Sequence, residues 1–231
     1  MTPVETQGGI TVADVRTEAL SLLGSVPDGD DLDPAAVALI TLAVNAAVSS
    51  LDADGIDGAV RTALDAGATT AQVHETLVVV SGLGVHTLME GSRRVAAILR
   101  ERGETVLDQP LDADRAALRS RMQGDDPYWN DFEREVPGFL DALLRLSPEA
   151  YEAFFAYTAV PWRTGAVRGR VKELMSMATD ATPTHRYLPG VRVHLANAVR
   201  LGAGRTAVLH ALDIAAAAPL HSGVPAAPGL T

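Results

Sequence analysis

The sequence contains no cysteine among its 231 residues. This absence excludes disulfide bonds, thiolate metal sites and every mechanism that needs a cysteine nucleophile or a redox-active cysteine pair. Lysine is nearly absent as well, because Lys172 is the single lysine among 19 basic residues. Lys172 is therefore the one side chain that could form a Schiff base with a substrate.

Basic charge is scarce relative to acidic charge. The 19 lysine and arginine residues stand against 29 aspartate and glutamate residues, which gives a formal net charge of −10 at pH 7. Nucleic-acid binding depends on basic side chains that neutralise phosphates, so no nucleic-acid partner is expected. The length suits one compact domain or two small ones.

Long apolar runs and targeting signals are also missing. Residues 1–9 have neither a basic segment nor an apolar run, so we expect no signal peptide. The longest uncharged stretch before the C-terminal tail, residues 34–51, contains four polar side chains and is shorter than the roughly 20 apolar residues of a membrane span. We therefore expect a soluble, cytoplasmic protein without a membrane partner.

Residues 1–127 contain no Phe, Trp or Tyr, and all ten such side chains lie between Tyr128 and Tyr187. The first half must therefore build its core from Ala, Val and Leu. For the second half two interpretations stay open. The aromatic side chains either line a ligand pocket or simply form a hydrophobic core.

Nearly the whole chain has the apolar spacing of helices, with neither an alternating strand pattern nor a hairpin signal. The spacing predicts helices over residues 12–23, 36–49, 58–65, 70–80 and 92–102, and later helices that begin near Asn130, Ser147, Arg168, Pro189 and Thr206. The predicted fold class is all-α.

The chain matches itself without gaps when it is shifted by 135 residues. Gly67-Ala68 then meets Gly202-Ala203, and the other matched pairs include Leu39 with Leu174, Ala43 with Ala178, Gly55 with Gly190, and His86 with His221. This pattern predicts a tandem duplication. The first repeat would cover residues 10–100, a helical connector residues 101–144 and the second repeat residues 145–225.

The two predicted copies differ where chemistry would be located. Glu173 and His194 of the second copy correspond to Ala38 and Ala59 of the first. Both polar side chains are therefore missing together from one copy. This difference predicts one working site, in the second repeat, and one degenerate repeat with a structural role.

The segment from residue 171 to residue 212 carries the motifs of a known family. It contains Lys172-Glu173-Leu174, then His194-Leu195, then Ala198 followed by Gly202-Ala203. With these motifs the chain resembles the carboxymuconolactone decarboxylase / alkyl hydroperoxidase D superfamily, as a two-repeat member without the Cys-xx-Cys pair. The resemblance implies an all-α, tandemly duplicated helical bundle that assembles into oligomers.

The resemblance also separates two kinds of chemistry. The peroxidase branch of the superfamily uses a Glu, a Cys-xx-Cys pair and a His, and counting back from His194 places the two cysteine positions at Tyr187 and Gly190. Thiol peroxidase activity is therefore rejected. The decarboxylase branch needs no cofactor. We predict a cofactor-free lyase that acts on a small unsaturated or lactone acid by acid/base catalysis, without a metal.

Two alternatives to the lyase stay open. One is a cofactor-free isomerase or cyclase of a biosynthetic pathway, which would use the same acid/base residues. The other is a non-catalytic binding or scaffold protein that kept the fold. The enzyme hypotheses require Glu173 and His194 to lie within hydrogen-bond reach and to face a cavity, whereas the scaffold hypothesis predicts a cavity filled by side chains.

Four residues are the predicted catalytic groups. Glu173 lies in an otherwise apolar helix, where a carboxylate needs a partner. If His194 is that partner, the carboxylate of Glu173 would raise the pKa of His194 and make it a general acid/base. His185 and Tyr187 lie in a proline-bounded loop and are predicted to donate to a developing enolate. The alternative for Glu173 is a position at an exposed helix start, and for His194 it is a hydrogen-bonded core histidine. For His185 and Tyr187 the alternative is an ordinary capped connection between helices.

The predicted substrate-binding residues are Arg192, Arg186 and Arg163, which can clamp a carboxylate, and Trp162 and Tyr157, which can wall the pocket. Solvated surface charge and core packing are the alternative roles of these side chains.

Two further predictions concern structure. His86 and His221, which coincide under the repeat, are assigned a shared structural role such as capping or a trimer contact. Residues 36–49 are apolar nearly all round, so they must be buried in the protein or at an interface. Together with the family resemblance this predicts a homotrimer, with a hexamer as the second possibility.

Overall fold

The computed structural model describes residues 9–105, 107–221 and 223, and these residues form helices and connecting loops without a β-strand. The all-α prediction is confirmed. The elements are α1 (Val12–Leu23), α2 (Pro34–Ala46), α3 (Ala53–Asp65), α4 (Thr70–Ser81), η1 (Gly82–Val85), α5 (His86–Glu101), α6 (Ala113–Gln123), α7 (Tyr128–Glu135), α8 (Phe139–Leu146), α9 (Pro148–Thr158), α10 (Val160–Arg163), α11 (Gly169–Ala181), α12 (Leu188–Arg200) and α13 (Arg205–Ala216). Within the described ranges, no helix combines the length and the apolar character that crossing a bilayer requires.

Local sequence signals explain where several helices begin. Thr11 and Thr69 each accept a hydrogen bond from the third residue of the following helix, whose side chain bonds back, so both form capping boxes. Asp33 and Ser147 cap helices whose first residue is proline, a residue that suits this position because it lacks the N–H.

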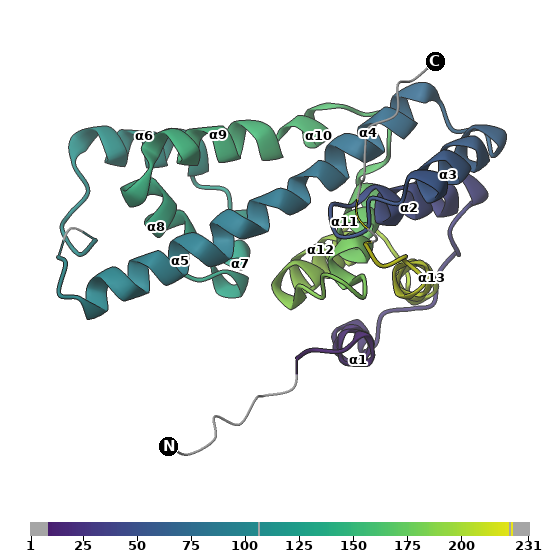
Figure 1. The fold of residues 1–231 in the computed structure, drawn as a ribbon, viewed down its shortest axis with the longest axis horizontal. Coiled ribbons are helices and arrows are strands. Elements are labelled where there is room, and N and C mark those ends of the chain that lie inside the picture. Colours follow the sequence, from purple (N-terminus) through teal and green to yellow (C-terminus); the bar gives the residue numbers. More distant parts are fainter. Residues whose placement is uncertain (1–8, 106, 222, 224–231) are drawn as a thin grey trace.

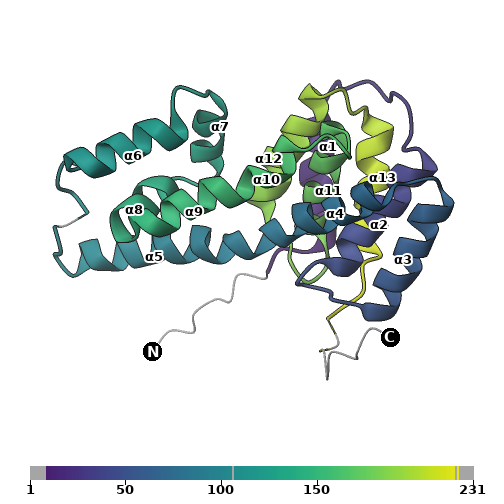
Figure 2. The ribbon, with the colours of Figure 1, turned by 90° about the horizontal axis from the view of Figure 1, so that it is seen from above.

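The helices pack around two separate hydrophobic cores (Figures 1 and 2). The first core joins α1 to α4 with α11 to α13 and consists mainly of Ala, Val and Leu. The second core gathers side chains of α5 to α9 and contains most of the buried aromatic residues. A continuous rod made of α4, η1 and α5 runs from one core into the other (Figure 1).

The rod differs from the sequence prediction, which placed a break between residues 80 and 92. Gly82 and Gly84 form a short 3-10 helix that continues α4 into α5, so α5 begins at His86. A 3-10 turn is a common connector between α-helices. The two glycines argue against a helix in the sequence, so the helical character of residues 82–91 was not predicted.

The first core has an internal symmetry. Helices α2, α3 and α4 begin and end 135 residues before α11, α12 and α13. The two non-glycine residues with positive φ among the described residues, Leu51 at 43° and Arg186 at 49°, are separated by the same offset. We therefore propose that the two helix triplets are copies of one unit. Residues 222, 224 and 225 of the predicted second repeat lie outside the described residues.

Helix α2 is buried within the chain. It packs against α3, α4, α11 and α13, and eight of its 13 residues are buried. The apolar character of this helix is thus satisfied by the chain itself, so it gives no support of its own to an oligomer interface.

Candidate active site

A cavity of about 940 Å³ lies where the two cores meet. Its walls come from the end of α4, η1, the start of α5, the end of α6, and helices α7, α9, α10, α11 and α12. Eight of the ten Phe, Trp and Tyr residues line it, namely Tyr128, Trp129, Phe132, Phe154, Phe155, Tyr157, Trp162 and Tyr187. Both interpretations of the aromatic half therefore apply, because the aromatic core is also the cavity wall.

Glu173 and His194 meet at this cavity. Helix α11 carries Glu173 and the adjacent helix α12 carries His194, and the Glu173 Oε2 to His194 Nδ1 distance is 2.7 Å. Glu173 is 6% exposed, and both residues line the cavity. The two conditions that the enzyme hypotheses set, hydrogen-bond reach and an open cavity, are both met.

The environment of His194 favours its charged form. Burial lowers the pKa of His194, but the hydrogen bond and charge of Glu173, together with the charge of Asp180, outweigh burial and raise it. Because Nδ1 is engaged by Glu173, we assign the proton of this bond to Nδ1. Nε2 is then the ring nitrogen left to act on a ligand.

Asp180 lies about two helical turns beyond Glu173 on α11 and is fully buried. Neither of its carboxylate oxygens has a hydrogen-bond partner among the residues that the structure describes. Burial raises the pKa of Asp180 to about 7, against the opposing effect of the His194 charge. Oδ2 of Asp180 lies 4.0 Å from Nε2 of His194.

Two more imidazoles surround Asp180. Its Oδ1 lies 3.8 Å from Nδ1 of His86 and 3.6 Å from Nε2 of His185, and these two nitrogens are 2.8 Å apart. Tyr187 stacks on His86 with ring centroids 4.2 Å apart, and its hydroxyl donates to Glu90. Burial, followed by the charges of the neighbouring histidines, lowers the pKa of His86 to about 3.

A solved structure from Burkholderia xenovorans LB400 is similar to this chain over nearly its full length. Its description reads "putative gamma-carboxymuconolactone decarboxylase subunit". The two share 30% sequence identity with a TM-score of 0.68, over 90% of this chain and 84% of that chain. The chain belongs to the carboxymuconolactone decarboxylase-like superfamily. No protein-family model and no curated protein matches the chain.

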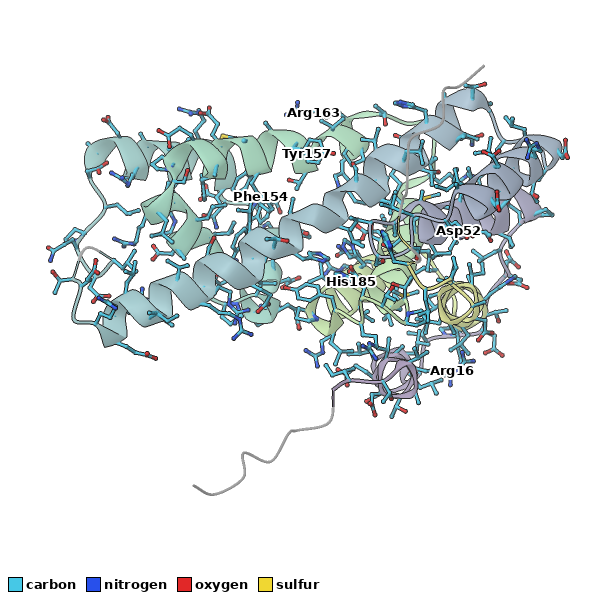
Figure 3. All side chains as sticks on the ribbon, viewed as in Figure 1. Arg16, Asp52, Phe154, Tyr157, Arg163 and His185 are labelled. Carbon is cyan, nitrogen blue, oxygen red and sulfur yellow. The ribbon has the colours of Figure 1, made fainter. Side chains whose placement is uncertain are left out.

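The structure of this superfamily member brings together all four predicted catalytic residues. Glu173, His194 and Tyr187 line the cavity, and His185, which is not among its lining residues, lies 3.6 Å from Asp180 (Figure 3 labels His185). The sequence analysis missed Asp180 as a site residue, although its spacing placed it on the face of Glu173. It also gave His86 a structural role. The contact of His86 with Asp180 joins parts of the chain 94 residues apart, so spacing along the sequence could not predict it.

The predicted substrate-binding residues divide into two groups. Arg163, Trp162 and Tyr157 line the cavity, and Figure 3 labels Arg163 and Tyr157 along α10 and α9. Arg192 and Arg186 are not among the residues that line it in the described part of the chain.

Arg192 is engaged elsewhere. Its Nε donates to Glu18 of α1 at 2.7 Å and its guanidinium also reaches Glu135 of α7. The arginine therefore joins three helices and has its fork occupied by protein carboxylates. Substrate binding by Arg192 would require both ion pairs to break.

Two cavity arginines were not found by sequence reasoning. Arg121 pairs with Glu152, and Arg200 pairs with Asp131. In the described part of the chain no salt bridge engages Arg163. Arg163 is thus the cavity arginine whose guanidinium is not already paired with a carboxylate.

Lys172 is buried and fully hydrogen-bonded. It is 2% exposed and donates to Glu75 Oε1 at 2.8 Å and to the backbone carbonyls of Pro161 and Thr164. The three donors of its ammonium group are used by these partners. Lys172 therefore ties α11 to α4 and is not presented to a ligand as a nucleophile.

Proposed function

We propose that this protein is a lyase that removes the carboxylate group of a small unsaturated or lactone acid, with His194 and Glu173 as its acid/base pair. The observation that supports this proposal is the 2.7 Å hydrogen bond between Glu173 and His194 at the wall of an open cavity. The corresponding residues of the first helix triplet, Ala38 and Ala59, have no polar side chains. Because the pair is present in one helix triplet and absent from the other, a catalytic role explains it better than a requirement for folding.

The proposed reaction begins with binding of the substrate carboxylate by Arg163, whose planar guanidinium can donate hydrogen bonds to both carboxylate oxygens. Loss of CO₂ breaks the carbon–carbon bond, and the electron pair moves into a conjugated carbonyl to form an enolate. The imidazolium of His194 then delivers a proton from Nε2 to the carbon that CO₂ left. Glu173 stabilises the charged ring before the transfer.

The cavity walls supply the remaining elements. Tyr187 lines the cavity, and its hydroxyl can donate toward the enolate oxygen when it gives up its hydrogen bond to Glu90. Trp162 and Tyr157, 45% and 47% exposed, offer aromatic surface at the cavity for a planar conjugated acid. The aromatic lining and the acid/base pair together favour an unsaturated, anionic ligand.

The experiment is a screen of unsaturated and lactone acids with the purified protein. CO₂ release and the mass of the product are followed together, since decarboxylation lowers the mass and isomerisation leaves it unchanged. His194→Ala serves as the inactive variant. His210→Ala is the matched control, because His210 also bonds a carboxylate, Asp31 at 2.8 Å, but lies outside the cavity.

The proposal fails if no compound of this class is turned over. It also fails if the turnover found persists in His194→Ala at the level of His210→Ala. A product of unchanged mass would replace the lyase by an isomerase that uses the same pair.

We further propose that the protein works as a homotrimer. Helix α5 presents the apolar side chains Leu88, Val95 and Ile98 at 38%, 46% and 53% exposure. Exposed apolar side chains at this spacing share one face of a helix and are typical of protein–protein contacts.

A further inference from the structure

Asp180 is an unusual residue for the interior of this fold. Its side chain is fully buried, and neither oxygen has a hydrogen-bond partner among the described residues. A buried carboxylate without hydrogen bonds is unfavourable, and the nearby His194 ring, 4.0 Å from Oδ2, is too far away to donate one. The carboxylate therefore indicates a ligand of positive charge.

The first helix triplet shows that the fold does not need this carboxylate. Asn45 occupies the corresponding position of α2, and its amide donates to the carbonyl of Thr41 at 2.7 Å. A carboxylate cannot donate this bond. Both positions face a glycine of the next helix, Gly55 for Asn45 and Gly190 for Asp180. The aspartate is thus the less favourable choice for folding alone.

The groups around Asp180 have the chemistry and spacing of metal ligands. Asp180 Oδ1, His86 Nδ1 and His185 Nε2 form a triangle with sides of 2.8, 3.6 and 3.8 Å, whose circumscribed radius is about 2.0 Å. A point in this triangle is therefore equidistant from all three atoms at the length of zinc–nitrogen and zinc–oxygen bonds, about 2.0–2.2 Å. These three residues could together hold a metal ion.

We propose that His86, His185 and Asp180 bind one divalent first-row transition-metal ion. Two imidazoles and one carboxylate suit Zn²⁺, Fe²⁺, Mn²⁺ and Co²⁺, whereas Ca²⁺ and Mg²⁺ favour sites made of oxygen ligands. The ion supplies the direct partner that the oxygens of Asp180 lack.

Binding requires a rearrangement of the two histidines. Their rings lie within 9° of parallel, and His86 Nδ1 and His185 Nε2 now share one hydrogen bond. When the ion binds, the ring that donates this bond takes its other tautomer, so its proton moves to its second nitrogen and both facing nitrogens offer lone pairs. Rotation of the rings then directs these lone pairs to the ion.

The surroundings support the position of the ligands. Tyr187 stacks on the His86 ring and fixes its orientation, as the supporting residues of metal sites commonly do. His86 and Asp180 both line the cavity, so the remaining coordination positions of the ion face its interior. A water molecule or an anionic oxygen of a small molecule can fill them. The site would form whether or not the proposed decarboxylation takes place.

The test measures metal uptake by the intact protein. The protein is treated with a chelator, desalted and titrated separately with Zn²⁺, Mn²⁺ and Co²⁺, with the bound metal quantified by elemental analysis. We expect one equivalent of at least one ion, and with Co²⁺ we expect visible absorption bands that report nitrogen and oxygen ligands. The proposal is overturned if none of the three ions reaches one equivalent.

Variants locate the ion. Asp180→Asn copies the side chain that the fold already accommodates at Asn45, and His185→Ala changes a loop residue. Each should weaken binding by about tenfold or more, since even indirect supporting residues contribute tenfold to hundredfold. His210→Ala, which removes a surface imidazole bonded to Asp31, should bind as the unchanged protein does.

Undiminished uptake in both Asp180→Asn and His185→Ala would place the ion elsewhere and overturn the proposal. Equal losses in His210→Ala would do the same. Circular dichroism of each variant confirms folding. Because the readout is bound metal, the result is independent of whether a substrate is turned over.

Discussion

Gly190 of α12 lies so close to the carboxylate of Asp180 on α11 that a Cβ atom at position 190 would overlap it. The same relationship recurs 135 residues earlier, where a Cβ atom at Gly55 would overlap the amide of Asn45. The absence of a side chain at both glycines therefore sets how closely the paired helices of each triplet approach.

Gly190→Ala should destabilise the protein by roughly 1–3 kcal/mol, because the methyl group forces α12 away from α11 or displaces Asp180. Gly58→Ala is the matched control, since Gly58 also lies within a helix but has nothing within 4 Å of an added Cβ. This control should be stabilised by about 0.5–1 kcal/mol. Urea unfolding of both variants measures the difference, and a Gly190→Ala variant as stable as Gly58→Ala would contradict the close approach.

His194→Ala should lower turnover by about 10²–10⁴, the usual contribution of a general acid/base. Glu173→Gln should cost less, because glutamine keeps a hydrogen bond to the ring and loses only the charge. The double variant should be little worse than His194→Ala, since the two residues act as a unit. Steady-state kinetics on the acid found by the screen provides the measurement, and losses that simply add would show two independent sites.

Lys172→Met should destabilise the protein by about 3–5 kcal/mol, because it leaves Glu75 buried without its countercharge. The double variant Lys172→Met, Glu75→Leu should recover much of this loss, since two apolar side chains replace the whole ion pair. Arg61→Ala, which breaks an exposed ion pair with Asp57, is the control and should change stability by less than about 1 kcal/mol. Equal effects of Lys172→Met and Arg61→Ala on the urea midpoint would refute the role of burial.

The protein should not reduce peroxides with thiol donors. Tyr187 and Gly190 stand where the resemblance places the cysteine pair of the peroxidase branch, and the sequence has no cysteine elsewhere. Peroxide consumption with a dithiol donor should therefore equal that of the buffer. A rate comparable to that of dithiol peroxidases would show that this reasoning about the two positions is wrong.

Light scattering at micromolar concentration should give about three times the 24.2 kDa mass of the chain. Val95→Arg, on the apolar face of α5, should lower this mass by placing charge in the interface. Val48→Arg changes a valine that is also exposed, at 59%, but lies in the loop after α2, and it should leave the mass unchanged. A monomer for the unchanged protein would contradict the trimer.

Sequence reasoning succeeded where the signals were local. Helical spacing predicted an all-α fold, and the 21 residues between Glu173 and His194 placed them on successive helices. Asp180 also carried a local signal, because it shares a helix face with Glu173.

The features that sequence reasoning missed depend on distant contacts. His86 reaches Asp180 where the 3-10 segment Gly82–Val85 continues α4 into α5, and the hydrogen-bond partners of Arg192 lie up to 174 residues away. Spacing along the chain cannot show that an arginine is already paired with Glu18. It also cannot show which of several exposed arginines border a cavity whose walls come from eight different helices and a 3-10 turn.

The cavity is a gap between two bodies, since its walls belong to two hydrophobic cores that pack separately. Its width therefore depends on how the two bodies are placed relative to each other, and the rod of α4, η1 and α5 contributes side chains to both. His86 is the first residue of α5, which contributes to the second core, whereas Asp180 lies on α11, which contributes to the first core. A ligand that binds both residues would link the two bodies and fix the width of the cavity.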